Sequence, residues 1–324
     1  MRKRKKSWFI DIGEALTKVV VAIIADSGEI LIKDVRIAKT PGQLWPAANA
    51  SPQLKARRFL RPLLRGYRRD EEVVLLINHR HIVVGTFTFP MMTISELEEV
   101  VSWQLELLIE ADREAWRIDF VAHEKNQWLE YLGMDNKELQ VLGVAIEKRL
   151  LAGLVKIFRD NGCCLTTIVP HFYPMDILFT LGQNQTGLII EIGKKWTRFF
   201  YFEGDTLKEY QQLGLETTWD GEMYLQQIVK MSERVILSPT VDGKNGAHQK
   251  IYLMGGESLH PGVLEYLTKW LRCEIIPCYR LLEKLGELVF PEPMSPAELC
   301  LIAPCLCSMI KKTQLTRRGA INEA

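Results

Sequence analysis

The stretch Trp8-Phe9-Ile10-Asp11-Ile12-Gly13-Glu14-Ala15-Leu16-Thr17-Lys18 decides how this chain folds, because a variant of it returns as LIIEIGKKWTR at residues 188–198. Both copies fit the pattern I-[DE]-I-G-x-x-x-T-[KR]. Each continues into a strand rich in valine or aromatic residues and then a turn centred on glycine, Gly28 or Gly204. The same motif in the same context indicates an internal duplication.

In each copy the motif is typical of a hairpin whose glycine lets the backbone approach a phosphate, with a carboxylate placed for a metal ion or water. Two such hairpins facing one another predict a phosphate clamp between two lobes. The strand at residues 251–254 ends in Gly255-Gly256, which we expect to meet the helix at 263–271, since a helix N-terminus suits phosphate. The candidate cofactor-binding residues are Asp11, Gly13, Thr17, Lys18, Glu191, Gly193, Thr197, Gly255 and Gly256, and the candidate metal ligands are Asp11 and Glu191.

The rest of the chain predicts an α/β protein. Thr93 and Glu96 form a capping box for a helix that we expect to reach about residue 110. Gly162 ends another helix, and Pro304 is expected to divide the last helix, capped at Ser295, from a closing apolar segment. Further strands are predicted at 8–11, 17–25, 30–36, 71–77, 82–89, 116–123, 138–145 and 165–169, and further helices at 54–67, 147–161, 175–181 and 221–234.

These elements divide the chain into two lobes. Residues 7–182 form the first lobe, with a β-α-β-β unit inserted at about 82–146, and residues 183–312 form the second lobe. Residues 1–6 are expected to be a basic tail and residues 313–324 a C-terminal tail.

Composition excludes several classes of protein. Lys plus Arg number 41 and Asp plus Glu 40, so the charge balance does not favour nucleic-acid binding. No stretch approaches the roughly 18 apolar residues that a membrane span needs. The seven cysteines lack zinc-site spacing and predict buried reduced thiols in a reducing cytosol.

On these motifs the chain resembles the actin-like ATPase superfamily, and within it the PilM family of type IV pilus assembly proteins with its divergent HofM relatives. The resemblance covers about residues 8–311, and the inserted unit is similar to the one that PilM and the division protein FtsA carry. It implies an actin-like, ribonuclease H-like duplicated fold. It also implies ATP and Mg²⁺ as cofactors.

Three departures from the family pattern argue against nucleotide chemistry. Glu14 stands where the family has Ser or Thr, and a carboxylate about 4 Å from a phosphate costs on the order of 1 to 4 kcal/mol. Glu191 replaces the usual Asp and is one methylene longer. Fewer than forty residues separate Gly214 from Ile251, so the second lobe is reduced and most of the nucleoside wall is missing. We expect a degenerate ATP site and no catalysis.

The resemblance implies a cytoplasmic scaffold of type IV pilus assembly or DNA uptake, peripheral to the inner face of the membrane. Its implied partners are the pilus assembly complex and the N-terminal peptide of a PilN-type inner-membrane protein, held in a groove between the first lobe and the inserted unit. No nucleic acid is implied. The alternatives are an active Mg-ATP-dependent ATPase or small-molecule kinase using Asp11 and Glu191, and a division-type filament protein.

Other features left open two interpretations each. The arginines of the helix at 54–67 suit either an acidic partner or a solvated surface, and the tail at 2–6 suits either anionic lipid or solvent. Trp103 is expected in the core, with a partner groove as the alternative. The histidines are interpreted as polar residues without catalytic or ligand roles: His79, His81, His123, His171, His248 and His260.

Overall fold

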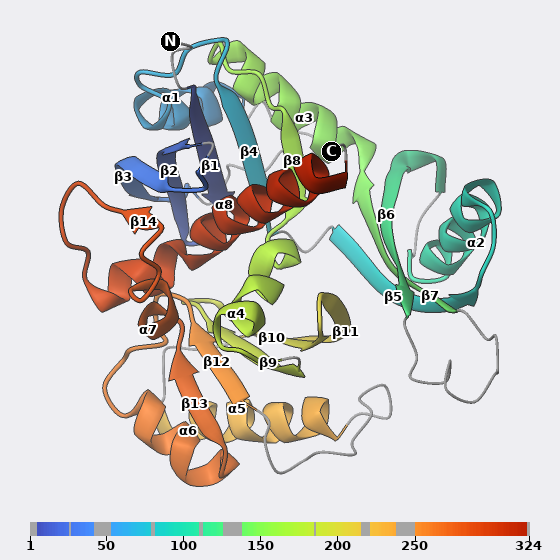
Figure 1. The fold of residues 1–324 in the computed structure, drawn as a ribbon, viewed down its shortest axis with the longest axis vertical. Helices are drawn as coiled ribbons and strands as arrows, with labels where there is room; N and C mark the ends of the chain where they lie inside the picture. Colours follow the sequence, from blue (N-terminus) through green and yellow to red (C-terminus); the bar gives the residue numbers. More distant parts are fainter. Residues whose placement is uncertain are drawn as a thin grey trace.

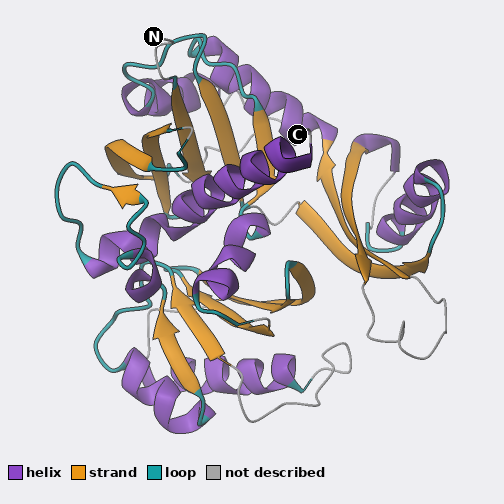
Figure 2. Ribbon diagram, in the orientation of Figure 1, coloured by secondary structure: helices purple, strands orange, loops and turns teal. Residues whose placement is uncertain are grey.

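Two β-sheets with the same strand order form the frame of the structure, a computed structural model (Figures 1 and 2). It describes residues 5–25, 27–41, 53–78, 82–109, 113–125, 138–184, 186–214, 221–237 and 250–322. The first sheet has the order β14-β3-β2-β1-β4-β8 and the second the order β11-β10-β9-β12-β13. The first sheet contains β1 (Lys6–Ile12), β2 (Leu16–Ile24), β3 (Ile30–Lys39), β4 (Glu72–Ile77), β8 (Thr167–Pro170) and β14 (Leu288–Val289). The second contains β9 (Thr186–Ile192), β10 (Trp196–Glu203), β11 (Thr206–Gly214), β12 (Lys250–Met254) and β13 (Glu274–Pro277).

The two sheets match in register as well as in order, so the predicted duplication is confirmed. Asp11 pairs with Lys18 across β1 and β2, and Glu191 pairs with Arg198 across β9 and β10. The bulge at Val21 in β2 has its counterpart at Tyr201 in β10. All these equivalent positions lie 180 residues apart, as expected of an internal repeat.

Helices cover the outer face of each sheet. The outward side chains of β1, such as Trp8 and Ile10, pack under α1 (Gln53–Leu63) and α3 (Lys148–Asp160), whereas Phe9 points to the opposite face. This alternation follows from the two-residue period of a strand. The second sheet is covered by α5 (Gly221–Ile236) and α6 (Val263–Leu271).

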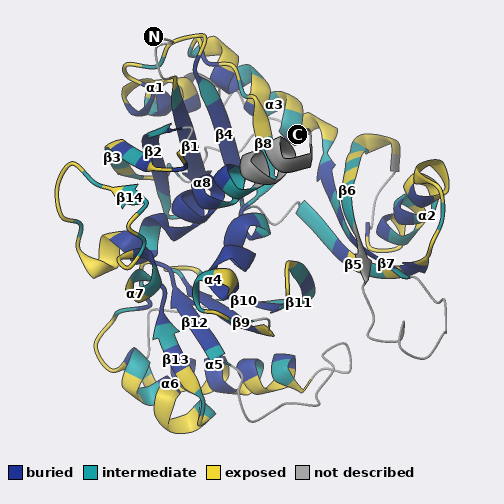
Figure 3. Cartoon of the chain, viewed as in Figure 1, coloured by how far each residue is buried: buried dark blue, intermediate teal, exposed yellow. Residues whose placement is uncertain are grey.

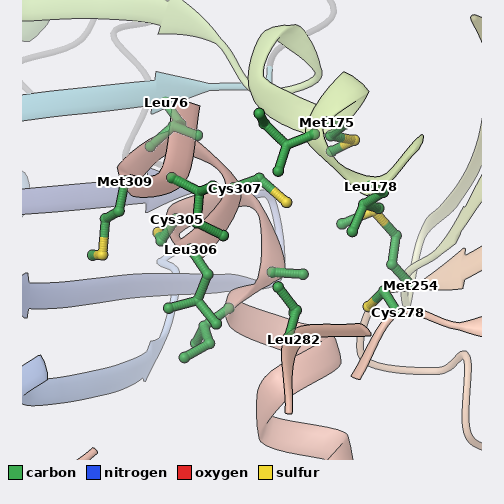
Figure 4. Close-up of a cluster of buried hydrophobic side chains, with 14 of the residues drawn as sticks. Leu76, Met175, Leu178, Met254, Cys278, Leu282, Cys305, Leu306, Cys307 and Met309 are labelled. Atoms are coloured by element: carbon green, nitrogen blue, oxygen red, sulfur yellow. The ribbon is translucent and has the colours of Figure 1, made fainter. Parts of the chain in front are cut away.

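The inner faces of both sheets share one core around α8 (Pro296–Asn322). Figure 4 shows this core. Cys305, Leu306 and Cys307 of α8 lie among side chains from β4 (Leu76), from the segment around Met175 and Leu178, and from β12 (Met254). The segment consists of a 3-10 helix (Tyr173–Asp176) and α4 (Ile177–Leu181), and α7 (Tyr279–Leu282) lies nearby. The late helix α8 therefore packs on β1 and β2 of the first lobe.

Two expectations about the end of the chain were wrong. Pro304 does not divide the last helix, because α8 runs through it from Pro296 to Asn322. The core supports the helix on both sides of Pro304: residues 299–310 are buried, except Leu301, which is half-buried. Residues 313–322 continue this helix and are not a tail.

Five of the seven cysteines are buried free thiols, whereas Cys164 is exposed and Cys273 half-buried.

The inserted unit is a three-stranded sheet of order β5-β7-β6 with one helix on it. The helix α2 (Ile94–Glu106) begins with the predicted Thr93–Glu96 capping box but ends before residue 110. Trp103 is 57 % exposed, so its assignment to the core was wrong; the helix buries Leu97, Val101 and Leu105 instead (Figure 3). The remaining elements are β5 (Ile82–Pro90), a 3-10 turn (Arg113–Ala115), β6 (Trp116–Lys125) and β7 (Glu138–Glu147).

Within the described residues, no helix is long and apolar enough to cross a membrane. The expected helix at 54–67 is α1, which ends at Leu63 with Pro62 in its last turn. His79, His81, His248 and the loop at 239–247 lie outside the described residues.

Candidate functional site

The two repeated hairpin turns face the same cavity, as the repeat predicted. Gly13 and Gly193 both line a space of ≈ 340 Å³ between the lobes. The two turns have the same hydrogen bond: Gly13 N–H donates to Leu16 O at 3.1 Å and Gly193 N–H to Trp196 O at 3.0 Å. These two amides therefore close the hairpins, and their hydrogen bonds go to the protein's own carbonyl groups.

Seven of the nine predicted binding residues line this cavity: Asp11, Gly13, Lys18, Glu191, Gly193, Gly255 and Gly256. The two threonines do not. Thr17 Oγ1 is buried 2.9 Å from Thr40 Oγ1, and the Thr197 hydroxyl is hydrogen-bonded to that of Tyr224. Each threonine precedes the cation of its strand by one residue, so its side chain points to the opposite face of the sheet.

The Gly255 turn is held tightly between the second sheet and α8. Gly255 has φ +95°, and a Cβ there would lie 2.4 Å from Ile192 O. Its N–H donates to Cys300 O at 3.2 Å. In a regular helix that carbonyl would accept from the residue four positions on, which is Pro304 and has no N–H. Pro304 therefore leaves Cys300 O available for the turn.

The helix N-terminus beside the cavity belongs to α8 and not to α6. Ala297, Glu298 and Leu301 of α8 line the cavity, whereas none of its lining residues comes from α6. The helix expected at 263–271 is α6, and residues 257–262 separate it from the Gly255-Gly256 turn, so its N-terminus is not part of the cavity lining. Glu298 closes its own capping box, its carboxylate accepting from Ser295 N–H at 2.9 Å. A carboxylate thus occupies the place where an anion would be attracted.

Each hairpin carries one acid and one base on neighbouring strands. Lys18 Nζ donates to Asp11 Oδ2 at 2.6 Å, and both side chains are buried. In the second repeat, Arg198 Nη1 lies 3.5 Å from Glu191 Oε2. The pairing follows from the strand register, which places Lys18 opposite Asp11 and Arg198 opposite Glu191.

His171 joins the two acid–base pairs across the cavity. Its Nε2 lies 3.0 Å from Glu191 Oε2 and its Nδ1 lies 3.6 Å from Asp11 Oδ1. From the sequence, His171 was assigned no role, and the place of this side chain in the network was not predicted. The available signal was its position directly after β8, since the carboxyl ends of parallel strands gather at one edge of a sheet. Its backbone N–H donates to Ile77 O of the neighbouring strand at 2.9 Å.

The network is charged at neutral pH. Burial disfavours an imidazolium, but Glu191 and Asp11 outweigh it and raise the pKa of His171 to about 9. Burial likewise disfavours ionised carboxylates, yet Lys18 and His171 hold the pKa of Asp11 well below its ordinary range. His171 and Arg198 lower the pKa of Glu191 to about 2. Three cationic groups therefore outnumber the two carboxylates that they face.

This arrangement does not fit a resident Mg²⁺ ion. Mg²⁺ takes carboxylate oxygens and water in octahedral geometry, and both carboxylates here already interact with cationic side chains. The charged imidazole of His171 lies between Asp11 and Glu191, where the metal would bridge them. The described residues contain no group of three or more His, Cys, Asp or Glu side chains that could hold a metal.

The two hairpin turns are also joined directly. Trp196 Nε1 donates to Glu14 Oε2 at 2.8 Å, so the residue that departs from the family's Ser or Thr connects the lobes. Lys194 and Lys195 are exposed at the edge of the cavity.

A second, larger space lies between the inserted unit and the first sheet, with a volume of ≈ 560 Å³. One wall is a face of β6 and β7 that includes Val121, Leu142 and Val144. The other wall is β8, of which all four residues, 167–170, contribute. Successive side chains of a strand point to opposite faces of the sheet, so a cavity on one face would be lined by every second residue. All four residues of β8 line this space, and therefore the edge of the strand faces it. Within the described residues β8 pairs with β4 alone, so this edge is open. We refer to this space as the β8 groove.

Comparison with solved structures shows the fold. A PilM–PilN type IV pilus biogenesis complex matches over 97 % of this chain and 99 % of that chain, with a TM-score of 0.72 and 18 % identity. A Bacteroides thetaiotaomicron protein with actin-like ATPase fold and unknown function matches over 86 % and 95 %, with a TM-score of 0.50 and 13 % identity. The cytoplasmic domain of EpsL, an inner-membrane component of the Vibrio cholerae type II secretion system, matches over 96 % and 95 %, with a TM-score of 0.50 and 12 % identity.

The chain therefore has the actin-like fold, as expected. No protein-family model matches it, and no curated protein matches it by sequence.

Proposed function

We propose that this protein is an actin-like scaffold of a type IV pilus, DNA-uptake or related secretion machine, and that it binds an extended N-terminal segment of a PilN-type inner-membrane protein in the β8 groove. This role places it in the cytoplasm at the inner face of the membrane. The similarity to the PilM–PilN complex over nearly the whole of both chains supports the choice of partner.

The observation that supports this proposal is the open edge of β8 in the β8 groove. An added strand on the open edge of β8 gains backbone hydrogen bonds, while the apolar face of β6 and β7 offers pockets to alternate side chains. Arg117 and Asp119, both exposed, bring one cation and one anion to the wall of the groove. Such binding needs no catalysis. It is therefore compatible with a cavity between the hairpins in which Asp11 and Glu191 already interact with cationic side chains.

Peptide binding tests the proposal. A fluorescent peptide with the cytoplasmic N-terminal sequence of the PilN-type protein from the same organism is titrated with the full chain, and anisotropy is measured. Val144→Glu places a charge on the wall of the groove and should weaken binding at least ~10-fold, because an unpaired buried charge is costly. Val155→Glu is the matched control, since Val155 is an exposed valine of α3 outside the groove. No binding by the folded wild type, or equal binding by both variants, would refute the proposal.

We also infer that the cavity between the hairpins is a degenerate ATP site. The support is internal neutralisation: Asp11 and Glu191 interact with Lys18, Arg198 and His171. Calorimetric titration with Mg-ATP should give no saturable heat up to millimolar nucleotide. Tight binding that Asp11→Ala abolishes would instead favour the rival function, an active ATPase or small-molecule kinase.

A further inference from the structure

From residue 55 onward, where the side chains are described, the outer side of α1 exposes arginines and no large apolar side chain. Its inner side packs Leu60 and Leu63 into the core of the first sheet. Between residues 53 and 69 the sequence contains no acidic residue. None of the exposed arginines pairs with a carboxylate in the part of the chain that the structure describes. These arginines are Arg57, Arg58, Arg61, Arg65, Arg68 and Arg69.

The N-terminal segment adds to the same surface. Lys5 Nζ lies 3.9 Å from Asp70 Oδ2, which places the start of β1 beside the arginines at 68 and 69. The ion pair offsets the charge of Asp70, the nearest exposed acid in sequence.

The positive charge is local to this surface. The chain as a whole has a formal net charge of only +1. The helix α2 on the inserted unit instead exposes Glu96, Glu98, Glu99 and Glu106. A nearly neutral protein with such separated charges is oriented by an anionic surface and is not attracted to it from all sides.

We propose that this basic face, formed by Lys5 and the six exposed arginines of residues 57–69, docks on an anionic phospholipid membrane. The charges lie on the exposed side of α1 and on the segment that follows it, which suits a plane of phosphate headgroups. Among the described side chains of residues 55–69, no large apolar one is exposed, so binding is electrostatic and peripheral, without insertion. The proposal does not depend on the partner in the β8 groove.

Vesicle sedimentation tests this proposal with the full chain. The vesicles are pure phosphatidylcholine, or phosphatidylcholine with 30 mol % phosphatidylglycerol, at about 0.05 and 0.5 M salt. Arg57→Gln/Arg58→Gln/Arg61→Gln/Arg65→Gln removes four charges from the face. Lys230→Gln/Arg234→Gln/Lys269→Gln/Lys284→Gln removes four exposed charges from the second lobe and is the matched control.

The wild type and the control should bind the anionic vesicles at low salt and not the neutral ones. Each cation near an anionic surface strengthens binding roughly fivefold, so the α1 variant should bind at least ~50-fold more weakly. Binding should fall at 0.5 M salt, where the screening length is only a few ångströms. The α1 side chains are exposed, and unchanged thermal unfolding of the variant confirms that it folds.

Three results would overturn the proposal. In the first, the folded wild type does not bind anionic vesicles at low salt. In the second, the two quadruple variants lose binding equally, which would show that net charge and not this face is responsible. In the third, the wild type binds a 30-base-pair DNA duplex at the same salt but not the vesicles, which would assign the face to nucleic acid. A failure here leaves the peptide titration with Val144→Glu unaffected.

Discussion

Glu14 and Trp196 lie 182 positions apart in the sequence, and a 2.8 Å hydrogen bond from the indole Nε1 to the carboxylate Oε2 joins them. They occupy equivalent turns of the two repeats, so this contact links one half of the duplication to the other. Both residues line the cavity between the lobes, so the hydrogen bond joins the two hairpin turns beside that cavity.

The Glu14–Trp196 contact should contribute to the stability of the two-lobe structure. Glu14→Ala and Trp196→Phe should each lower the free energy of unfolding, and the double variant should show a coupling energy of about 1 kcal/mol, as for a partly exposed hydrogen bond to a charged group. Urea denaturation of the four proteins measures it. Strictly additive effects would mean that the two side chains do not interact in solution.

The buried Asp11–Lys18 pair should be sensitive to the loss of one partner. Lys18→Met leaves a carboxylate buried beside an apolar side chain and should cost about 3–5 kcal/mol in unfolding free energy. The double variant Asp11→Asn/Lys18→Met should recover part of that loss. Lys250→Met breaks the more exposed pair with Glu274, 3.6 Å apart, and as a control should cost less than about 1 kcal/mol. Equal losses from the two lysine variants would contradict the buried pairing.

His171 should make the unfolding free energy fall at alkaline pH. Its pKa rises from 6.5 to about 9 on folding, so its stabilising effect is fully present below pH 6.5 and is lost as the pH rises through 9. The loss is on the order of 2–3 kcal/mol. The facing carboxylates Asp11 and Glu191 stay ionised over this window because their pKa values are lowered, and the pKa of Lys18 is raised from 10.5.

Urea titrations at intervals between pH 6 and 9.5 measure this dependence. His171→Gln, which has no ionisable side chain, should flatten the alkaline decline. On the acid side, Glu191 should lose its stabilising effect as the pH falls from its ordinary pKa of 4.5 toward 2. A decline above pH 6.5 that is identical in the variant would assign it to another group.

The two adjacent glycines of the cavity should differ in their tolerance of a methyl group. Gly255→Ala places Cβ 2.4 Å from Ile192 O at a positive φ, and should lower the free energy of unfolding by at least ~1–3 kcal/mol. At Gly256 the nearest atom is Leu301 Cδ1 at 3.4 Å, so Gly256→Ala should be close to neutral. Thermal unfolding of both variants compares them. Equal melting temperatures would show that the turn is not held as the structure has it.

Local patterns predicted most elements because they depend on neighbours in sequence. The helix predicted at 263–271 matches α6, and the capping box at Thr93 and Glu96 is present. Proline was a less reliable signal for the end of a helix. Pro304 lies inside α8, where the surrounding core compensates for the lost hydrogen bond and the Gly255 amide uses the carbonyl that is left. The low helix propensity of proline is outweighed at this position by tertiary packing.

The candidate site was predicted in part. The repeat placed Asp11 and Glu191 at equivalent positions, and the structure brings both to one cavity. Thr17 and Thr197 belong to the same motif but face away from the cavity, because motif matching ignores which side of a strand a residue takes. His171 lies outside the repeated hairpin motif, and its contacts depend on two carboxylates at distant positions in the chain.

The sequence by itself determined the two repeated hairpins and the pairing of acid with base in each, since both follow from periodicity and register within one short stretch of chain. The tertiary structure alone decided what lies between the repeats. The distances from His171 to both carboxylates, and from Glu14 to Trp196, depend on how two separately formed sheets pack around α8. Packing of that kind depends on the shape of the whole core, which no local pattern encodes.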